Sequence, residues 1–352
     1  MRWDIFCRVI DHHGDLGLCW RLSADLAARG ETVRLWVDDP LALVWMAPHG
    51  ARGVTVIRWV DPLPDVEPGD VVVEAFGCDP PPAFVARMPS RAPAPVWINL
   101  EYLSAETYVE RSHGLASPQA RGAGAGLAKW FFYPGFTGAT GGLLREAHAL
   151  AARDSGTAHW LAAQGVTLRE GERRISLFAY ADAPLAPLFD LLDTEPTLVL
   201  LAAGAAQVPA LALFDDQQRR GSHLRAQVLP WFDHAGYDCL LRACDLNFAR
   251  GEDSIVRAMW AGVPFVWQIY AQADGVHVAK LDALLERMTA GSAPALATAL
   301  RQLWRAWNGL GPWPTALPDA PGWQALCSVW HDQLANQSDL TSQLIGFAAA
   351  RR

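Results

Sequence analysis

The sequence predicts an α/β protein built from two doubly wound, Rossmann-like domains. Short apolar segments of strand length alternate with helix-length segments along most of the chain, and a second alternating series begins at Arg174. Such alternation is typical of parallel sheets that helices cover on both faces. The chain has 352 residues, of which 51% are apolar, so it is long for one hydrophobic core and can supply two.

Five apolar segments predict the strands of the first domain. They are Trp3–Ile10, Thr32–Val37, Asp70–Phe76, Val96–Leu100 and Trp130–Tyr133. After the first of them, residues 11–17 are expected to form a loop, and residues 18–28 have helical spacing that Gly30 ends. A helical stretch near 143–164 follows Gly- and Ala-rich sequence, so the first domain is expected to span residues 1–165.

A second set of apolar segments predicts the strands of the second domain, which is expected to span residues 166–335. They are Ile175–Tyr180, Thr197–Ala202, Leu224–Leu229, Leu246–Phe248 and Pro264–Trp267. Helices are predicted over 297–307 and 322–334. Their several Trp residues are expected to pack in the core of this domain rather than to stack on bases.

Composition argues against several classes of function. The formal net charge is −8, which disfavours nucleic acid as a ligand because phosphate backbones attract clustered Lys and Arg. Asp4 and Arg8 interrupt the first apolar segment, so a signal peptide is not expected. No uncharged apolar run reaches about 18 residues, so a membrane span is not expected either. The six Cys form no C-x-x-C pair and are expected to be buried thiols in a reducing cytosol, which favours a cytoplasmic location.

Residues 247–254, with the sequence NFARGEDS, run from a predicted strand into a predicted helix over 255–262. Asp253 or Ser254 can cap the helix start, whose free N–H groups favour an anion, and Arg250 adds a fork of donors suited to phosphate. A carboxylate beside such a phosphate site can hold a sugar hydroxyl, which indicates a nucleotide-sugar enzyme. An ordinary capped helix with surface charges explains the segment equally well, so both interpretations stay open at this point.

Asp11 and Asp15 lie in the loop after the first predicted strand, together with Gly14 and Gly17. Glycines in a strand-to-helix turn let the backbone approach a ligand, although the G-x-G-x-x-G spacing of dinucleotide-binding loops is absent. Two carboxylates four residues apart provide a candidate general base and a neighbour that can orient it or shift its pKa. Simple capping of the following helix is the alternative for either Asp.

Four segments of the chain resemble the EarP family of protein-arginine rhamnosyltransferases, which modify translation elongation factor P. They are Val9-Ile10-Asp11-x-x-Gly14-Asp15-x-Gly17-x-x-Trp20-Arg21-Leu22, residues 97–106 (WINLEYLSAE), residues 245–254 (DLNFARGEDS) and residues 264–270 (PFVWQIY). The resemblance runs in the family's order from the first strand to about Leu281. The sequence departs from the family at His12-His13, where Asn and an aromatic are more common, and at Ala271, where Pro is common. Neither departure removes a group that is assigned to the chemistry.

The resemblance implies the GT-B glycosyltransferase architecture, in which two Rossmann-like domains face a cleft. In that architecture the last helix crosses back to the first domain. The candidate is Leu340–Ala350, so residues 336–352 are assigned to the first domain. A monomer is expected.

The resemblance also implies the reaction. The family's donor is dTDP-β-L-rhamnose, and its acceptor is an arginine side chain of elongation factor P, whose modification activates it for the rescue of ribosomes stalled at polyproline. The product is an α-rhamnosyl arginine, so the anomeric centre inverts. No cofactor or metal is expected, since the sequence lacks an Asp-x-Asp motif in a glycosyltransferase-A context and GT-B enzymes typically need no metal.

On this resemblance, Asp15 is assigned as the general base or the carboxylate that orients the acceptor guanidinium, with Asp11 as its partner. Arginine is protonated in water and is a poor nucleophile, so two carboxylates could bind the guanidinium and localise a lone pair on one nitrogen. The donor phosphates and sugar are assigned to Arg250, Gly251, Glu252, Asp253, Ser254, Gly17, Gln272 and Asp274. The thymine is assigned to Tyr180 and Phe232, with Phe178 as a third candidate for which core packing is equally expected.

Two other functions stay open on the sequence alone. The chain could be another GT-B nucleotide-sugar glycosyltransferase with a small-molecule acceptor, which would share the donor site and lack the guanidinium site at Asp11 and Asp15. It could also be a nucleotide-sugar-binding regulator on an inactive scaffold. The presence of both Asp residues and of residues 250–254 disfavours the regulator.

Overall fold

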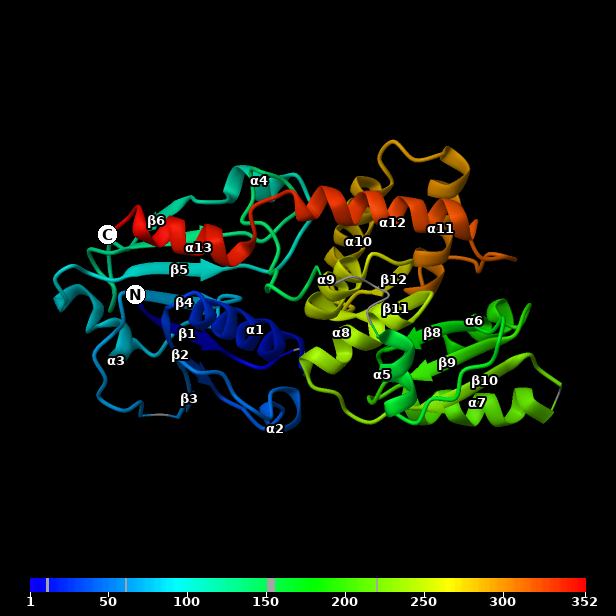
Figure 1. The fold of residues 1–352 in the computed structure, drawn as a ribbon. Helices are drawn as coiled ribbons and strands as arrows, with labels where there is room; N and C mark the ends of the chain where they lie inside the picture. The colour runs from blue at the N-terminus through cyan, green and yellow to red at the C-terminus, as the bar shows by residue number, and fades with distance from the viewer. Residues whose placement is uncertain (11–12, 61, 151–155, 220) are drawn as a thin grey trace. The chain divides into compact units, whose positions relative to one another are not determined.

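The computed structural model describes residues 1–10, 13–60, 62–150, 156–219 and 221–352. These residues form two compact units, each with its own sheet (Figure 1). The first unit comprises Met1–Ala147 and Asn336–Arg352, and the second comprises His148–Ala335. Both ends of the chain therefore belong to the first unit.

The boundary between the units lies after Ala147 and not near residue 165. The reason is that helix α5 (Thr157–Ala163) packs against α8 (His234–Ala243) of the second unit. The helical stretch expected near 143–164 is also shorter than predicted. Within its described residues only α5 is helical, and the carbonyl of Leu143 instead accepts the N–H of Leu340 at 2.9 Å.

The first unit contains a seven-stranded sheet with the strand order β3-β2-β1-β4-β5-β7-β6. Its strands are β1 (Arg2–Cys7), β2 (Thr32–Val37), β3 (Val54–Arg58), β4 (Val71–Ala75), β5 (Val96–Leu100), β6 (Ala116–Pro118) and β7 (Ala128–Phe132). All neighbours are parallel except β6 and β7. Sequence patterns predicted five of these strands and missed β3 and β6, which form the two edges. β3 is half exposed and β6 has only three residues, so neither shows a continuous apolar segment.

Helices and loops cover both faces of this sheet. On one face, α1 (Gly14–Ala28) packs beside α13 (Leu340–Ala349) over a core of aliphatic strand residues. On the other face lies an aromatic cluster in which the rings of Phe6 and Trp36 stack at 5.4 Å and Phe84 packs edge-on. The remaining helices of the unit are α2 (Leu43–Met46), α3 (Pro82–Val85), α4 (Tyr108–Ser112) and a 3₁₀ turn (Met88–Ser90).

The second unit contains a five-stranded parallel sheet with the order β10-β9-β8-β11-β12. Its strands are β8 (Arg173–Leu177), β9 (Thr197–Leu201), β10 (Leu224–Val228), β11 (Leu246–Arg250) and β12 (Phe265–Gln268). Besides α5 and α8, its helices are α6 (Leu185–Leu192), α7 (Gln207–Arg219), α9 (Gly251–Ala261), α10 (Val276–Thr289), α11 (Pro294–Trp307) and α12 (Ala320–Ala335). All five strands were predicted. Trp304, Trp307, Trp323 and Trp330 are buried, as core packing of these Trp residues requires.

The two sheets share one topology, which decides where ligands can bind. In each, the first strand is central, with β1 lying between β2 and β4, and β8 lying between β9 and β11. Ligands of doubly wound sheets bind at the carboxyl ends of the strands where the strand order reverses. The relevant loops are those that follow β1 and β4 in the first unit and β8 and β11 in the second.

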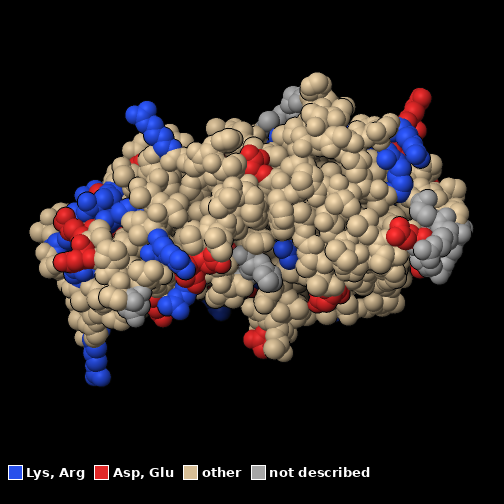
Figure 2. Space-filling model, turned by 90° about the horizontal axis from the view of Figure 1, so that it is seen from below, with Lys and Arg blue, Asp and Glu red and all other residues tan. Residues whose placement is uncertain are grey.

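The distribution of surface charge and the length of the helices can be compared with the expectation that the protein binds neither nucleic acid nor a membrane. On the face shown in Figure 2, Lys and Arg side chains lie among Asp and Glu side chains, and large areas carry neither. In the described part of the chain, no helix has the length and apolar content that crossing a membrane requires.

Candidate active site

The turn between β11 and α9 contains most of the predicted donor residues. β11 ends at Arg250, and α9 begins at the next residue. Gly251 has a φ of 68°, in the left-handed region that strains other residues, so the turn requires glycine. Arg250 occupies the N-cap position, and no described side chain caps the helix. Asp253 and Ser254 lie inside the first turn, so the prediction that one of them caps α9 is wrong. Without a side-chain cap, the positive end of the helix favours an anion.

Arg250 is held between two aromatic rings. Its Cζ lies 4.4 Å from the ring centre of Phe178 and 4.7 Å from that of Tyr180. Both rings follow β8, which pairs with β11, so the strand order brings three predicted donor residues together where the topology reverses. The side chain is only 7% exposed, and contact with two ring faces fixes the position of the guanidinium. That Phe178 and Tyr180 stack on thymine stays a prediction.

Ser254 is buried in the first turn of α9 and lies beside Tyr237 of α8. Burial raises the pKa of Tyr237, the neighbouring Ser254 hydroxyl partly opposes this, and the carboxylates of Asp253 and Asp238 raise it further. The phenol therefore stays protonated and can donate a hydrogen bond beside the helix start. Sequence reasoning missed Tyr237, because one aromatic residue in an amphipathic helix is indistinguishable from an ordinary core residue.

Glu252 forms an ion pair with Lys280 of α10. The sequence indicated that Glu252 binds a sugar or ribose hydroxyl or orients Arg250, and it did not identify Lys280. Both side chains are mostly buried but keep some exposure, so the carboxylate can accept a hydroxyl hydrogen bond while it is paired. No sequence signal marks Lys280, because only tertiary packing brings α10 to the start of α9.

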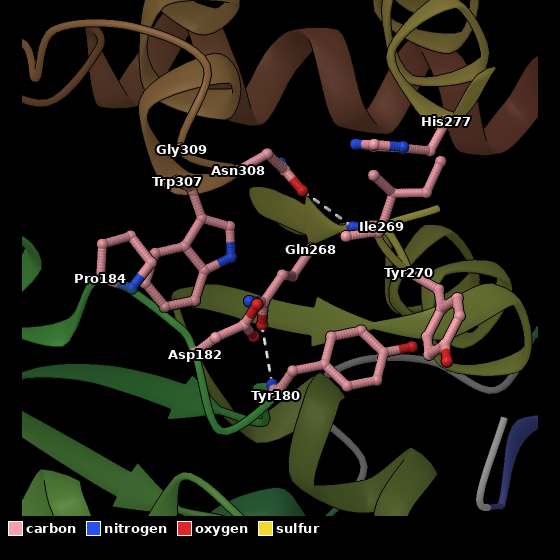
Figure 3. A pocket seen from close by; sticks show the side chains of 11 residues that line it. Tyr180, Asp182, Pro184, Gln268, Ile269, Tyr270, His277, Trp307, Asn308 and Gly309 are labelled. Atoms are coloured by element: carbon pink, nitrogen blue, oxygen red, sulfur yellow. Dashed lines mark hydrogen bonds between the residues drawn. The ribbon is translucent and has the colours of Figure 1, made fainter. Parts of the chain in front are cut away.

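A pocket of about 370 Å³ opens beside Tyr180 (Figure 3). Among its lining residues are Tyr180, Asp182, Gln268, Tyr270, His277 and Asn308. Gln268 Oε1 accepts the N–H of Tyr180 at 2.8 Å, and Asn308 Oδ1 accepts the N–H of Ile269 at 2.9 Å. The rings of Tyr180 and Tyr270 meet edge to face, with centroids 5.7 Å apart. The amides hold the loops after β8 and β12 in place, and the lining combines ring faces with polar groups.

Gln272 and Asp274 lie in the exposed turn that leads into α10. The backbone N–H of Gln272 donates to His277 Nδ1 at 3.1 Å, and Asp274 Oδ1 accepts the N–H of Val276 at 3.3 Å. Asp274 therefore helps to begin α10. The proposed contacts of both side chains with sugar hydroxyls stay predictions.

Phe232 lies beyond the end of β10, in the segment that leads into α8. Its ring packs on Trp160 with centroids 5.1 Å apart, against the same core cluster that Phe178 covers. Phe178 in turn meets the ring of Tyr237 at 5.7 Å. The two predicted thymine residues Phe178 and Phe232 therefore pack on one core cluster. Strands β8 and β10 both end earlier than the sequence suggested.

In the first unit, Asp15 lies in the first turn of α1 and is 3% exposed. Its Oδ2 accepts the N–H of Ile10 at 2.9 Å, which fastens the segment after β1 to the helix start. His13 occupies the N-cap position without a side-chain cap hydrogen bond, so Asp15 is not the N-cap residue. A carboxylate in the first turn is stabilised in its charged form by the helix dipole. Asp11, assigned as its partner, lies outside the described residues.

Gly17 lies within α1 and not in a loop before it, because the helix begins at Gly14. Its N–H donates to the carbonyl of His13 at 2.8 Å. The loop in which the sequence placed Gly17 is therefore shorter than predicted. The assignment of Gly17 to the donor phosphates stays a prediction. Its N–H already donates a hydrogen bond within the helix and would have to bind the phosphate in addition.

The same edge of the first sheet contains a further polar group. Burial raises the pKa of Glu101, which follows β5 and accepts a hydrogen bond from Asn99 Nδ2 at 2.7 Å. Asn99 Oδ1 also accepts the N–H of Gly77, in the loop after β4. In that loop Phe76 has a φ of 57°, a strained conformation for a bulky residue, and its ring stacks on Tyr102 at 4.2 Å.

Among the residues that the structure describes, no group of three or more His, Cys, Asp or Glu is arranged to hold a metal ion.

The amino-acid sequence is similar to those of known proteins over almost its whole length. Residues 3–349 match the family described as Elongation-Factor P (EF-P) rhamnosyltransferase EarP. A protein-arginine rhamnosyltransferase of Pseudomonas aeruginosa is 42% identical, over 99% of this chain and 98% of that protein. A protein-arginine rhamnosyltransferase of Neisseria meningitidis serogroup B is 32% identical, over 98% of this chain and 96% of that protein.

Solved structures give the same result for the fold. The structure described as "Structural basis for EarP-mediated arginine glycosylation of translation elongation factor EF-P" has a TM-score of 0.67, with 31% identity over 100% of this chain and 99% of that chain. The glycosyltransferase SnogD of Streptomyces nogalater has a TM-score of 0.54 at 15% identity, over 99% of this chain and 100% of that chain. The predicted GT-B fold is thereby confirmed. With a family match over nearly its whole length, the chain belongs to the EarP family of elongation factor P rhamnosyltransferases.

Proposed function

We propose that this protein transfers rhamnose from dTDP-β-L-rhamnose to an arginine side chain of translation elongation factor P, with inversion at the anomeric carbon. The modification would activate the factor for the rescue of ribosomes stalled at polyproline. Family membership supports the acceptor and the sugar. The observation in this chain that supports the proposal most is the guanidinium of Arg250, fixed between two rings at the uncapped start of α9.

The second unit supplies the donor side of the reaction. A nucleoside diphosphate leaves with negative charge, and a fixed cation beside a helix N-terminus stabilises such charge without any reorganisation. Arg250 would bind the diphosphate, with the backbone N–H groups of Asp253 and Ser254 and the Ser254 hydroxyl as further donors. Tyr180 and Phe232, with Phe178 as a third candidate, would bind the thymine, and Glu252 would accept a hydroxyl hydrogen bond.

The first unit supplies the acceptor side. Asp15 would bind the guanidinium and take up one proton from the attacking nitrogen as the N–C1 bond forms. The bond between C1 and the β-phosphate oxygen breaks in the same displacement, and dTDP leaves with the electron pair. The positive charge of the acceptor guanidinium suits this arrangement. The helix start stabilises the carboxylate of Asp15 as an anion, and the anion attracts the guanidinium.

The test is the intact mass of elongation factor P after incubation with this protein and dTDP-β-L-rhamnose. A gain of one deoxyhexose, placed on a single arginine by fragmentation, is the expected result. Matched reactions omit the donor or use a factor in which that arginine is replaced by Lys. An unchanged mass, with the donor either intact or only hydrolysed, would refute the proposal and favour a glycosyltransferase with a small-molecule acceptor.

We also propose that the transfer needs no divalent metal, since Arg250 and the start of α9 would provide the counter-charge for the diphosphate. The turnover rate after exhaustive chelation should equal that of the untreated protein. A loss of activity that magnesium or manganese restores would contradict this part of the proposal.

A further inference from the structure

A second pocket, of about 360 Å³, lies in the first unit and contains none of the side chains assigned to the transfer reaction. It is lined by Val9, Ile10, His13, Asp39, Leu41, Ala42 and Trp45, which we call the Trp45 pocket. These residues come from the segments that follow β1 and β2 and from the start of α2. The pocket therefore lies at the carboxyl edge of the sheet, next to the loop that leads to Asp15.

The walls of the Trp45 pocket are apolar and exposed. Ile10 is 65% exposed and Leu41 is 73% exposed, and Val44 beside them is also largely exposed. Most large aliphatic residues of this chain are buried, so neighbouring exposed ones indicate a surface that contacts another molecule. Trp45 gives the pocket an aromatic wall, against which the ring of His13 packs edge-on at 5.2 Å.

The polar part of the pocket is acidic. Asp39 is exposed, and its Oδ1 accepts the N–H of Leu41 at 3.1 Å. No Lys or Arg is among the described residues that line the pocket. Arg8, the nearest basic residue in the sequence, instead has its guanidinium over the ring of Trp59, 4.7 Å from the ring centre. Within the described lining, the carboxylate of Asp39 therefore has no Lys or Arg beside it, and the imidazole of His13 packs on Trp45.

A Lys or Arg side chain matches this combination better than a purely apolar one. Its methylene stem can cover Ile10 and Leu41 while its charged head meets the carboxylate of Asp39 and the indole of Trp45. A leucine or phenylalanine would fill the apolar part but would take water from Asp39 without providing a donor.

The pocket is also tied to the proposed catalytic carboxylate. Ile10 forms part of its wall, and the N–H of Ile10 donates to Asp15 Oδ2. A side chain that fills the pocket is therefore close to a guanidinium bound at Asp15. Both side chains can then belong to one surface of the same acceptor protein.

We propose that the Trp45 pocket binds a second basic side chain of the acceptor protein, a Lys or Arg near the arginine that is glycosylated. The proposal rests on the proposed function and names how the acceptor is recognised. One guanidinium contact provides little affinity after the cost of association, whereas a second contact adds affinity and orients the reacting nitrogen.

The test measures steady-state kinetics with folded elongation factor P and saturating dTDP-β-L-rhamnose. Asp39→Asn removes the charge but keeps an oxygen that can accept the N–H of Leu41, so the turn is preserved. We expect it to raise KM for the acceptor by roughly 3–10-fold with kcat unchanged, as for a partly exposed ion pair with an aromatic neighbour. Trp45→Ala should do the same and Trp45→Phe less. Glu170→Gln, which removes an exposed carboxylate from the second unit, is the matched control and should keep the parental KM.

Replacing the Lys and Arg residues of the acceptor one at a time by Ala identifies the occupant. One of them should raise KM as Asp39→Asn does, and combining the two changes should add no further effect, because both remove the same contact.

Three results would overturn the proposal. The first is a parental KM for every pocket variant while the parent protein glycosylates the factor, which leaves the proposed function intact. The second is a rise in KM for Trp45→Ala and Leu41→Ala but not for Asp39→Asn, which assigns the pocket to an apolar side chain. The third is a parent protein that transfers no sugar, which removes the proposed function as well.

Discussion

The connection from β1 to α1 and the turn from β11 into α9 occupy equivalent places in their sheets and have opposite chemistry. Each lies where the strand order reverses, and each leads into a helix that no described side chain caps. In the second unit the turn holds a cation, Arg250, between two rings. In the first unit it leads to an anion, Asp15, which a backbone N–H fixes in place.

The difference shows that the fold determines the place of a site and the side chains determine its charge. Both helix starts favour a negative group. At α1 the protein supplies that group itself, and the resulting carboxylate can attract a cationic acceptor. At α9 the first-turn Glu252 is paired with Lys280, and Arg250 offsets the charge of Asp253, so the uncapped N–H groups of the helix start can still favour an anionic ligand.

The largest effect is expected for Asp15→Asn, which removes the charge from the first turn while preserving its size. If Asp15 takes up the guanidinium proton, the turnover rate falls by about 10²–10⁴-fold. Single-turnover assays would measure that rate, and calorimetric titration should show unchanged dTDP binding, because the side chains assigned to the donor all lie on the other unit. Turnover near the parental rate would exclude Asp15 from the mechanism.

A smaller effect, on binding, is expected for Arg250→Ala. Charge-assisted hydrogen bonds to phosphate contribute about 1.5–3 kcal/mol, so the Kd for dTDP should rise roughly 10–150-fold in calorimetry. Arg250→Lys should restore little of this, since an ammonium group lacks the planar fork that stacks between the rings. Parental affinity in both variants would place the phosphates elsewhere.

Helix α13 offers the contrasting case of a capped helix start, where the effect should be on stability. Asp339 Oδ1 accepts the N–H of Ser342 at 2.9 Å, and the carboxylate also pairs with Arg29 of the first unit. Asp339→Ala should lower the free energy of unfolding of that unit by about 1 kcal/mol, as seen for lost N-caps. Thermal unfolding followed by circular dichroism measures this, with Asp332→Ala on α12 as the exposed control.

The same variant has a pH dependence with a definite sign. Burial raises the pKa of Asp339, but the hydrogen bonds from Ser342 and the charge of Arg29 outweigh it, so its pKa is lowered in the folded protein. A lowered pKa contributes stability that is present above the unfolded pKa, about 3.9, and is lost as the pH falls through the folded value. The difference in Tm between parent and variant should therefore shrink in acid. A difference that is constant down to acid pH would mean that the charge of Asp339 is not involved.

The smallest effect is expected for Tyr180→Leu, which removes one ring from Arg250. Loss of one cation–π contact costs about 0.5–1 kcal/mol, or about a 2–5-fold rise in the Kd for dTDP. In the background of Arg250→Ala the same change should have less effect, because its partner is absent. Equal effects in both backgrounds would instead show that Tyr180 contacts the ligand independently of Arg250, as its assignment to the thymine requires.

Local patterns were enough to predict most of the scaffold. Ten of the twelve strands among the described residues were predicted, because a buried parallel strand is a short apolar run in the sequence. The two that were missed, β3 and β6, lie at edges where exposure breaks that run. The placement of Arg250 and Gly251 where one strand ends, and of Asp15 in the connection that follows another, was equally visible, since the carboxyl ends of parallel strands share one edge.

Contacts between distant segments were not visible in the sequence. Asp4, in the middle of β1, is fully buried because Arg34, Trp36 and Gly69 all donate hydrogen bonds to its carboxylate. In the sequence alone it was only a charge within an apolar run. Helix starts were also misplaced by a few residues, because the periodicity of a helix does not show which residue is the N-cap.

The sequence by itself thus determined the fold class, the residue types at each turn and the family to which the chain belongs, because all three depend on order along the chain. Only the tertiary structure decided that two rings enclose Arg250, that Lys280 neutralises Glu252 and that Tyr237 lies beside Ser254. These pairings join segments far apart in the chain. Strand order and helix packing bring them together, and no local pattern of residues encodes which partners will meet.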